Sequence, residues 1–208
     1  MPVTLYHHPF SRAANAVWML EELGIPHELR FVDMFKGAHK APEILALNPM
    51  GKLPILTDDK GVVLTEGAAI ALYLADRYAP GKLAPALDDP RRAAYLRWTL
   101  FAPSVIEPGI SAREGKWEAK ESRVGWGNYD AMLRAFDVAI GNGPWLLGDM
   151  FSMADVVFGG TLRFMRMSKV FEPSAAVVAY TDRLDERPAA KRAHERNAAI
   201  AKEHGLGQ

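Results

Sequence analysis

The chain contains no cysteine, which removes disulfide bonds, thiolate metal ligands and any redox chemistry based on its own thiols. It also has no apolar run approaching the ~20 residues that a membrane-spanning helix needs. The first residues, MPVTLYHHPF, lack the basic region and the long apolar core of a signal peptide. From these absences we expect no membrane partner and a cytoplasmic location.

Neither sign of charge predominates, because 25 Lys and Arg residues balance 25 Asp and Glu residues. The chain therefore gives no electrostatic reason to expect a nucleic-acid partner. With 49% hydrophobic and 24% charged residues, its 208 residues have the composition of an ordinary soluble globular protein. This length suits one domain or two small ones.

The most informative stretch is NPMGKLPILTDDKGVVLTEGAAI, residues 48–70. Pro54 cannot donate a ladder hydrogen bond, so it belongs at the first residue or on the edge of a strand. Two short apolar runs, 54–57 and 62–65, flank a turn-rich connection of hairpin length and are predicted to be strands. A helical run, AAIALYLADRY, follows directly.

Three kinds of group are left free at one end of this predicted hairpin. They are the main chain of Leu53, the carboxylate of Glu66 and the unpaired N–H groups of the helix start. An extended peptide can pair with the Leu53 main chain as an added strand. The helix start can take an α-carboxylate and Glu66 the neighbouring ammonium group. The stretch therefore predicts a site for a short peptide that carries a free amino acid head.

NPMGKLPIL followed by LTEGAAIALYLADRY resembles the glutathione site of the cytosolic glutathione transferase superfamily, in its bacterial type. The resemblance implies a cis bond before Pro54, pairing of Leu53 with the cysteinyl backbone, and binding of the γ-glutamyl end by Glu66 and Gly67. The family usually has serine where this chain has Gly67, so the backbone contact remains and the hydroxyl contact does not. Without the resemblance, the alternative is a hairpin followed by an ordinary capped helix.

The rest of the chain predicts an α/β thioredoxin-like domain followed by an all-α helical bundle. The element order β-α-β-(α)-β-β-α over residues 1–79 is that of a thioredoxin-like domain, and the resemblance implies that this domain binds glutathione. Residues 80–88 form a linker by composition. Residues 89–208 read as helices, and the resemblance implies that they carry the hydrophobic co-substrate site.

Within the helical region, we expect one long helix disturbed at Pro103 and Pro108, and another over residues 123–140. Further helices are expected from Glu172-Pro173-Ser174 and over residues 188–203. PWLLGDMFSMADV resembles the family's capped helix, with Ser152 as N-cap and Asp155 at the third helical position. This motif is structural rather than catalytic.

Ser11 is the predicted catalytic residue. It comes after a first predicted strand, Val3-Thr4-Leu5-Tyr6, and the residues HHPF that break this strand. It precedes the helical run RAANAVWMLEELG, so it can also act as a plain N-cap. In the family, a small hydroxyl or thiol residue in this loop donates a hydrogen bond to the glutathione sulfur. The helix N-terminus and the cation of Arg12 would favour the thiolate further. Capping and thiolate stabilisation do not exclude each other.

Tyr6 and His7 are the alternatives to Ser11. Some classes use a tyrosine from the end of this strand, where this chain has His7, with Tyr6 one residue earlier. Successive strand residues point to opposite faces, so Tyr6 is expected in the core and His7-His8 is not expected to act as a metal pair. Arg12 stands where certain bacterial members carry cysteine, so their mixed-disulfide chemistry is not expected.

Lys52 and His39 are expected to reach the glycyl carboxylate of glutathione, unless they are merely solvated surface residues. A hydrophobic co-substrate is expected between the domains. Its candidate contacts, which could equally belong to a core, are Phe10, Phe101, Ile110, Trp117 and Phe164.

These residues together indicate a glutathione transferase. We expect the thiolate of glutathione, the co-substrate, to attack a hydrophobic electrophile without a metal, in a cytoplasmic homodimer that serves detoxification. The first alternative is a glutathione-dependent isomerase, reductase or dehalogenase that uses the same site. The second is a binding protein that kept the fold without turnover, which the glycine at position 67 would favour. Specificity lies in the helical domain, so the electrophile cannot be named from the sequence.

Overall fold

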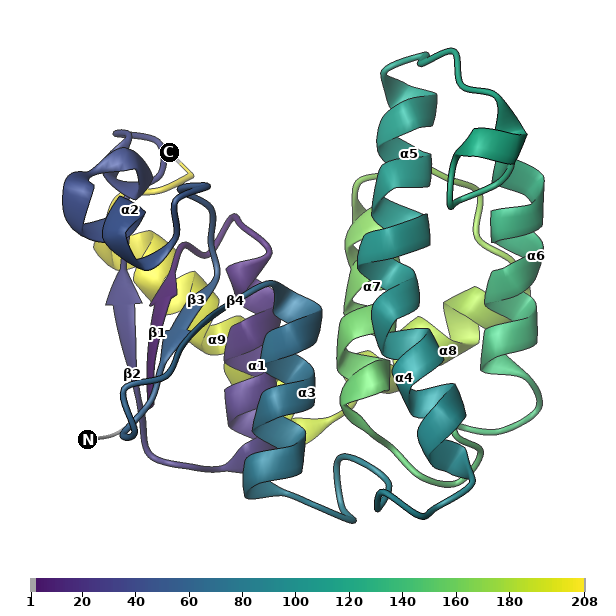
Figure 1. Cartoon of the computed structure of the whole chain (residues 1–208), viewed down its shortest axis with the longest axis horizontal. Helices are drawn as coiled ribbons and strands as arrows, with labels where there is room; N and C mark the ends of the chain where they lie inside the picture. Colours follow the sequence, from purple (N-terminus) through teal and green to yellow (C-terminus); the bar gives the residue numbers. More distant parts are fainter. Residues whose placement is uncertain (1–2, 208) are drawn as a thin grey trace. The chain divides into compact units, whose positions relative to one another are not determined.

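The structure, a computed structural model, describes residues 3–207 and divides into two compact units (Figure 1). The sheet unit contains the chain up to Leu74 together with the chain from Glu186 onward. The helical unit contains Ala75–Asp185. The expected α/β and all-α parts are therefore both present.

The sheet unit is built on a four-stranded mixed sheet with the order β2-β1-β3-β4. β1 runs parallel to β2 and antiparallel to β3, and β3 runs antiparallel to β4. This is the thioredoxin-like arrangement that the sequence predicts. The strands are β1 (Val3–His7), β2 (His27–Phe31), β3 (Ile55–Thr57) and β4 (Val63–Thr65).

The strand register brings four chain segments to one end of the sheet. His7 at the end of β1 lies beside Phe31 at the end of β2. Ile55 at the start of β3 lies between Tyr6 of β1 and Thr65 at the end of β4. The loops that leave β1, β2 and β4 and the loop that enters β3 therefore meet at the same end of the sheet.

Helices of the sheet unit follow the predicted order along the chain. α1 ends where Gly24 adopts a left-handed φ of 63° and donates its N–H to the carbonyl of Leu20, as expected of a glycine after a helix. α2 begins with a proline at its first position, where no intrahelical N–H is needed. The elements are α1 (Ala13–Leu23), η1 (Ala38–Lys40), α2 (Pro42–Leu47) and α9 (Pro188–Glu203); α3 (Gly67–Tyr78) runs on into the helical unit.

The last helix, α9, is fastened to α1 by ion pairs. Arg187 holds the Glu22 carboxylate with two hydrogen bonds of 2.7 Å each. Arg192 and Arg196 each bring a guanidinium nitrogen within 2.8 Å of the buried Glu21 carboxylate. These contacts tie α9 to the sheet unit, although its residues follow the helical unit in the chain (Figure 1).

This arrangement differs from the expected division, which assigned the whole of residues 89–208 to the helical domain. The helical character of α9 was predicted correctly, and its position was not. The partners of its arginines lie more than 160 residues earlier in the chain, so no local pattern indicates them.

The helical unit contains the disturbed long helix that the sequence predicts. Residues Ala102–Ile106 form a π-helical turn between α4 and α5, and Pro103 lies within it. Proline removes one backbone donor, and the wider turn accommodates that loss. The helices of this unit are α4 (Arg91–Phe101), α5 (Glu107–Glu114), α6 (Tyr129–Ile140), α7 (Gly160–Met167) and α8 (Ala175–Asp185). Within residues 3–207, none of the helices has the length and apolar character to cross a membrane.

α6 begins at Tyr129, whereas the sequence predicted a start at residue 123. Gly127 adopts a left-handed φ of 65°, which interrupts the helical path. Asn128 then caps α6, because its side-chain oxygen accepts the N–H of Ala131 at 2.8 Å. The apolar spacing continued across this break and concealed it.

Asp155 organises the interior of the helical unit. Its buried carboxylate accepts four hydrogen bonds of 2.9–3.1 Å, from the N–H of Leu146, the N–H and hydroxyl of Ser152 and the hydroxyl of Tyr180. The expected contact from Asp155 back to the N–H of Ser152 is present, while the Ser152 hydroxyl donates to the same carboxylate. Burial raises the pKa of Asp155 to about 6, and the four donors oppose that shift.

Asp155→Asn should lower the free energy of unfolding by about 3 kcal/mol, because an amide offers one acceptor oxygen to a site built of donors. Chemical denaturation at neutral pH measures the change. Asp149→Asn is the matched control, since that carboxylate is 95% exposed and lies 3.6 Å from Arg91. It should change stability by no more than about 0.5 kcal/mol. Equal stabilities of the two variants would contradict this account of Asp155.

Candidate functional site

The loop after β1 holds Ser11 at the beginning of α1. The carbonyl of His8 accepts both the N–H of Ser11, at 3.1 Å, and its hydroxyl, at 2.8 Å. The Ser11 oxygen in turn accepts the N–H of Ala13, the first residue of α1, at 3.1 Å. Ser11 therefore makes a helix-capping type of contact while its side chain stays half-buried.

The Ser11 hydroxyl carries one hydrogen, and in this structure that hydrogen is donated to the His8 carbonyl. Donation to a ligand atom would therefore replace this bond. Because a hydroxyl rotates freely about its C–O bond, the exchange needs no movement of the backbone. Arg12, the next residue, has an exposed side chain.

His7 and Tyr6 point to opposite faces of the sheet, as the alternation predicts. His7 is fully buried, and its Nε2 lies 2.8 Å from the Oδ1 of Asn197 on α9. The Asn197 amide nitrogen donates to the carbonyl of Ala193, so His7 Nε2 carries the hydrogen in this pair. Burial lowers the pKa of His7. His7 thus links β1 to α9 as a neutral side chain at neutral pH.

Tyr6 packs against the core cluster formed by Val32, Ile44 and Ile55. Its hydroxyl accepts a hydrogen bond of 3.1 Å from Arg30. Both alternatives to Ser11 therefore have structural partners of their own.

Asn48 shapes the loop that enters β3. Its side chain donates to the carbonyl of Lys52 at 2.9 Å and accepts the N–H of Met50 at 3.1 Å. Its own carbonyl accepts the N–H of Gly51 at 2.8 Å. Sequence reasoning missed this buried residue, although the Asn-Pro pair that begins the loop is a recognised turn signal.

Gly51 is required where this loop meets η1. Its φ is 57°, and a Cβ atom there would lie 2.8 Å from both the carbonyl of His39 and the side chain of Lys40. Lys40 also donates to the carbonyl of Met50 at 2.9 Å. The close approach brings His39 beside the loop that carries Lys52.

The Leu53–Pro54 peptide bond is cis, as the resemblance implies. The side chain of Leu53 packs against the core cluster of the sheet unit. Neither its N–H nor its carbonyl has a hydrogen-bond partner in residues 3–207. The main chain of Leu53 is therefore available to a ligand immediately before β3 begins.

Glu66 has a left-handed backbone, with a φ of 67°, and an exposed side chain. This conformation costs a non-glycine residue about 1–3 kcal/mol. Its carbonyl accepts the N–H of Ile70 at 2.9 Å, so the N–H groups of Gly67 and Ala68 belong to the open first turn of α3. Gly67 itself is outside the left-handed region, and a Cβ atom built on it would meet nothing within 4 Å.

His39 and Lys52 differ in their surroundings. The Nδ1 atom of His39 is buried and has no hydrogen-bond partner in the described part of the chain, while its residue as a whole is half-buried. Lys52 is exposed. Both lie in segments at the end of the sheet where β1, β2 and β4 stop.

The sheet unit therefore brings together most of the predicted site residues. If the β1–β3 and β3–β4 registers are continued by one residue, Pro54 lies between His7 and Glu66. The loop after β1 that carries Ser11, the loop before β3 that carries Leu53 and the start of α3 therefore all adjoin this end of the sheet. An acceptor and donor pair, a carboxylate, a helix start and a hydroxyl are thus arranged around one end of the sheet.

The expected co-substrate contacts are divided between the two units. Phe10, in the sheet unit, is 54% exposed and approaches Phe35 with a ring distance of 6.4 Å. In the helical unit, Phe101 packs on Trp98 at 5.3 Å and Ile110 is buried. Two further candidates on this unit are largely exposed: Trp117 and Phe164.

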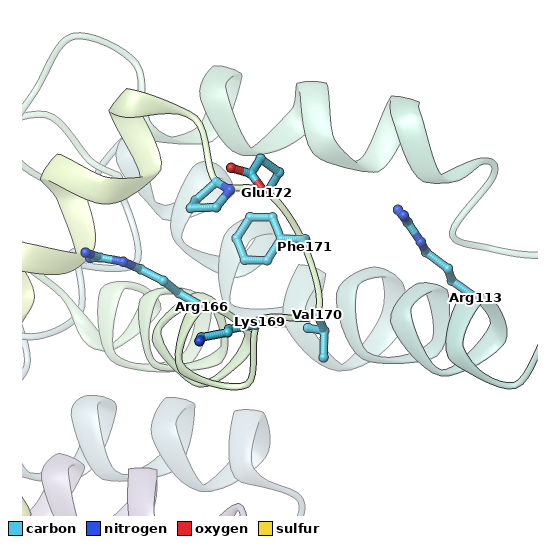
Figure 2. A pocket seen from close by; sticks show the side chains of 7 residues that line it. Arg113, Arg166, Lys169, Val170, Phe171 and Glu172 are labelled. Carbon is cyan, nitrogen blue, oxygen red and sulfur yellow. The ribbon is translucent and has the colours of Figure 1, made fainter.

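Figure 2 shows a hollow on the helical unit that contains none of these candidates. Two of its cations have partners of their own. Arg166 bonds to Thr181 at 2.8 Å, and Arg113 lies 3.8 Å from the ring centre of Tyr129. The hollow is lined by Arg113, Arg166, Lys169, Val170, Phe171, Glu172 and Pro173. Within residues 3–207, no group of acidic or histidine side chains has the arrangement of a metal site.

Comparison with known proteins identifies related families and structures. Residues 9–77 match the family model described as "Glutathione S-transferase, N-terminal domain", and residues 112–196 match "Glutathione S-transferase, C-terminal domain". "Glutathione S-transferase 2" of Schizosaccharomyces pombe is 31% identical over 97% of this chain and 98% of its own length.

Solved structures give the same result. A glutathione transferase from Methylococcus capsulatus has a TM-score of 0.77 at 28% identity, covering 95% of this chain and all of the other. The transferase URE2P6 from Phanerochaete chrysosporium, solved with oxidized glutathione, has a TM-score of 0.78 at 25% identity, covering 95% and 97%. The matched domains, the full-length relative and the shared fold lead to one conclusion: the chain belongs to the cytosolic glutathione transferase superfamily.

Proposed function

We propose that this protein is a glutathione transferase that joins the thiolate of glutathione to an electrophilic carbon of a hydrophobic small molecule. The observation that carries the proposal is the free main chain of Leu53, which lies at the same end of the sheet as Glu66 and the open start of α3. Family membership supports it, as do relatives named as glutathione S-transferases and a related structure with oxidized glutathione.

In the proposed complex, glutathione lies at this end of the sheet and pairs as an added strand with the segment that enters β3. The N–H and carbonyl of Leu53 pair with the cysteinyl backbone. Glu66 binds the γ-glutamyl ammonium group, and the N–H groups of Gly67 and Ala68 bind its α-carboxylate. At the other end, His39 and Lys52 would neutralise the glycyl carboxylate.

The proposed role of Ser11 is to keep the bound sulfur ionised. A free thiol has a pKa of about 8.5, so only a few per cent is thiolate at pH 7. Lowering that pKa by ~2 units takes roughly 2.7 kcal/mol of preferential stabilisation of the anion. A hydroxyl donor at the N-terminus of α1, with the positive end of the helix dipole behind it, is suited to this task.

The electrophile would be a hydrophobic compound, because the candidate contacts in both units are apolar. Each unit, taken by itself, has an exposed apolar side chain among these candidates: Phe10 in the sheet unit and Phe164 in the helical unit. We further propose that the protein acts as a cytoplasmic homodimer in detoxification. Binding of glutathione without turnover is the second candidate, favoured by Gly67, which cannot supply the hydroxyl contact usual in the family. Detection of a conjugate with a panel of electrophiles separates the two.

Ser11→Ala should raise the pKa of bound glutathione, because the thiolate loses its hydroxyl donor. Ultraviolet difference absorbance of the complex as a function of pH measures this pKa. The affinity for glutathione should change less than the pKa, since the peptide backbone contacts remain. Loss of the bond to Ala13 should also cost about 1 kcal/mol of stability, so unfolding is measured alongside. A titration curve that overlays that of the unchanged protein would exclude this role for Ser11.

Glu66→Gln should weaken glutathione binding tenfold to a hundredfold, roughly 1.5–3 kcal/mol, because it removes the charge from one hydrogen bond and keeps the shape. Calorimetric titration with glutathione at one pH and ionic strength measures the affinity. If Glu66 only favours the start of α3, affinity will not change.

Glu66→Gly is the companion variant. This substitution should also weaken glutathione binding. The variant should nevertheless have a higher free energy of unfolding, because glycine adopts the left-handed backbone at position 66 without strain. Loss of affinity together with gain of stability would separate the ligand contact from a structural effect.

Gly67→Ser should tighten glutathione binding by restoring the hydroxyl contact that the family usually has. The backbone at Gly67 is outside the left-handed region and the space for a Cβ atom is open, so the substitution should not disturb the fold. The gain should be about fivefold to tenfold, the worth of one hydrogen bond of about 1–1.5 kcal/mol. The same calorimetric titration measures it. Unchanged affinity would mean that the γ-glutamyl group does not lie over the start of α3.

A further inference from the structure

We propose that His8 is a positioning residue, which fixes the place of the Ser11 hydroxyl through the loop between β1 and α1. This inference rests on the proposed role of Ser11. His8 contacts that loop twice. Its ring Nδ1 accepts the N–H of Phe10 at 3.1 Å, and its carbonyl accepts the N–H and the hydroxyl of Ser11 at 3.1 and 2.8 Å. The main chain on both sides of Phe10 is thereby anchored to one residue.

The ring of His8 is itself held in place by aromatic neighbours. It is fully buried, with Phe35 edge-on at a centroid distance of 4.8 Å and Phe31 at 5.5 Å. Phe31 stacks on His204, directly after α9, at 3.7 Å and an interplanar angle of 10°. The His8 ring thus packs between the end of β2 and the loop that follows it, a position from which it can anchor the loop before α1.

The hydrogen bond to Phe10 defines the state of the His8 ring. A backbone N–H can only donate, so Nδ1 must be the unprotonated nitrogen and the ring hydrogen lies on Nε2. Burial lowers the pKa of His8, Asp33 opposes this shift, and His204 and His39 add to it. The neutral ring that the bond requires is thus the ring present at neutral pH.

The consequence for the proposed chemistry is geometric. A hydroxyl stabilises a thiolate only within hydrogen-bond distance of the sulfur. The chain between β1 and α1 is short, and Phe10 in its middle is 54% exposed, with its ring centre 6.0 Å from that of His8 and 6.4 Å from that of Phe35. Without the Nδ1 bond, the Pro9–Phe10 peptide, which precedes the peptide that carries the Ser11 N–H, would lose its hydrogen bond to the His8 ring, and the Ser11 hydroxyl would spend less time at the sulfur.

The test uses His8→Phe, which keeps a flat ring among Phe31 and Phe35 and removes the acceptor, and His8→Asn, whose side-chain oxygen can replace Nδ1. His8→Leu serves as a second acceptor-free variant if His8→Phe does not fold. Each is made alone and in the Ser11→Ala background. The pKa of bound glutathione, kcat and the KM for glutathione are measured for every folded variant.

We expect His8→Phe to raise the bound thiol pKa in the same direction as Ser11→Ala and to lower kcat about tenfold at neutral pH. KM for glutathione should stay within about twofold, since Leu53 and Glu66 are untouched, and His8→Asn should recover most of both losses. In the Ser11→Ala background, His8→Phe should produce no further rise in the thiol pKa, because it acts through the hydroxyl.

A folded His8→Phe or His8→Leu protein with the parent's thiol pKa and kcat would overturn the inference. So would equal effects of His8→Phe with and without Ser11, or failure of His8→Asn to recover what His8→Phe loses. The proposed function is judged separately, from the parent and Ser11→Ala proteins alone. If the parent does not bind glutathione, or if Ser11→Ala leaves the thiol pKa unchanged, the role of Ser11 fails before any His8 variant is considered.

Discussion

The packing of α9 against α1 is the contact on which the candidate site depends. Ser11 lies at the N-terminus of α1, so the place of its hydroxyl follows from the place of this helix. Two carboxylates of α1 are held by arginines: Glu21 by Arg192 and Arg196 of α9, and Glu22 by Arg187, the residue directly before α9. Removing one partner of a buried ion pair costs about 3–5 kcal/mol, and less where the partner is half-exposed, as Arg192 is. His7 adds a neutral link from the middle of the sheet to the same helix.

Much of the fold could be predicted because short-range chemistry marks it. Proline has no N–H, so Pro54 predicted the start of a strand, and the structure begins β3 directly after it. The glycine at the end of α1 and the proline at the start of α2 are local signals of the same kind. Boundaries without such a mark were predicted less well. The start of α6 was concealed because an apolar stripe continued past Gly127, and the position of α9 depended on partners far away in the sequence.

The candidate site shows the same division between local and distant causes. The alternation of side chains along β1 correctly predicted that Tyr6 and His7 point to opposite faces of the sheet. The hydrogen bond from His7 to Asn197 joins residues 190 positions apart, so no local sequence pattern predicts it. The left-handed backbone of Glu66 was also not foreseen, since glutamate has no preference for it. Strain of this kind persists where the surrounding structure imposes it, and it recurs at ligand sites. The structure therefore reveals a strained residue such as Glu66 as a candidate ligand contact, whereas the residue type alone does not predict the strain.

The discontinuous sheet unit has a consequence for biosynthesis. Ribosomes release a chain from its amino end, at about 5–20 residues per second. The strands, α1 and most of α3 emerge first, but the helix that neutralises Glu21 and covers His7 is made only after residues 75–185. Translating that interval takes on the order of 5–20 s. The helical unit is continuous and can close during this time, while the half that carries the candidate site waits for its last helix.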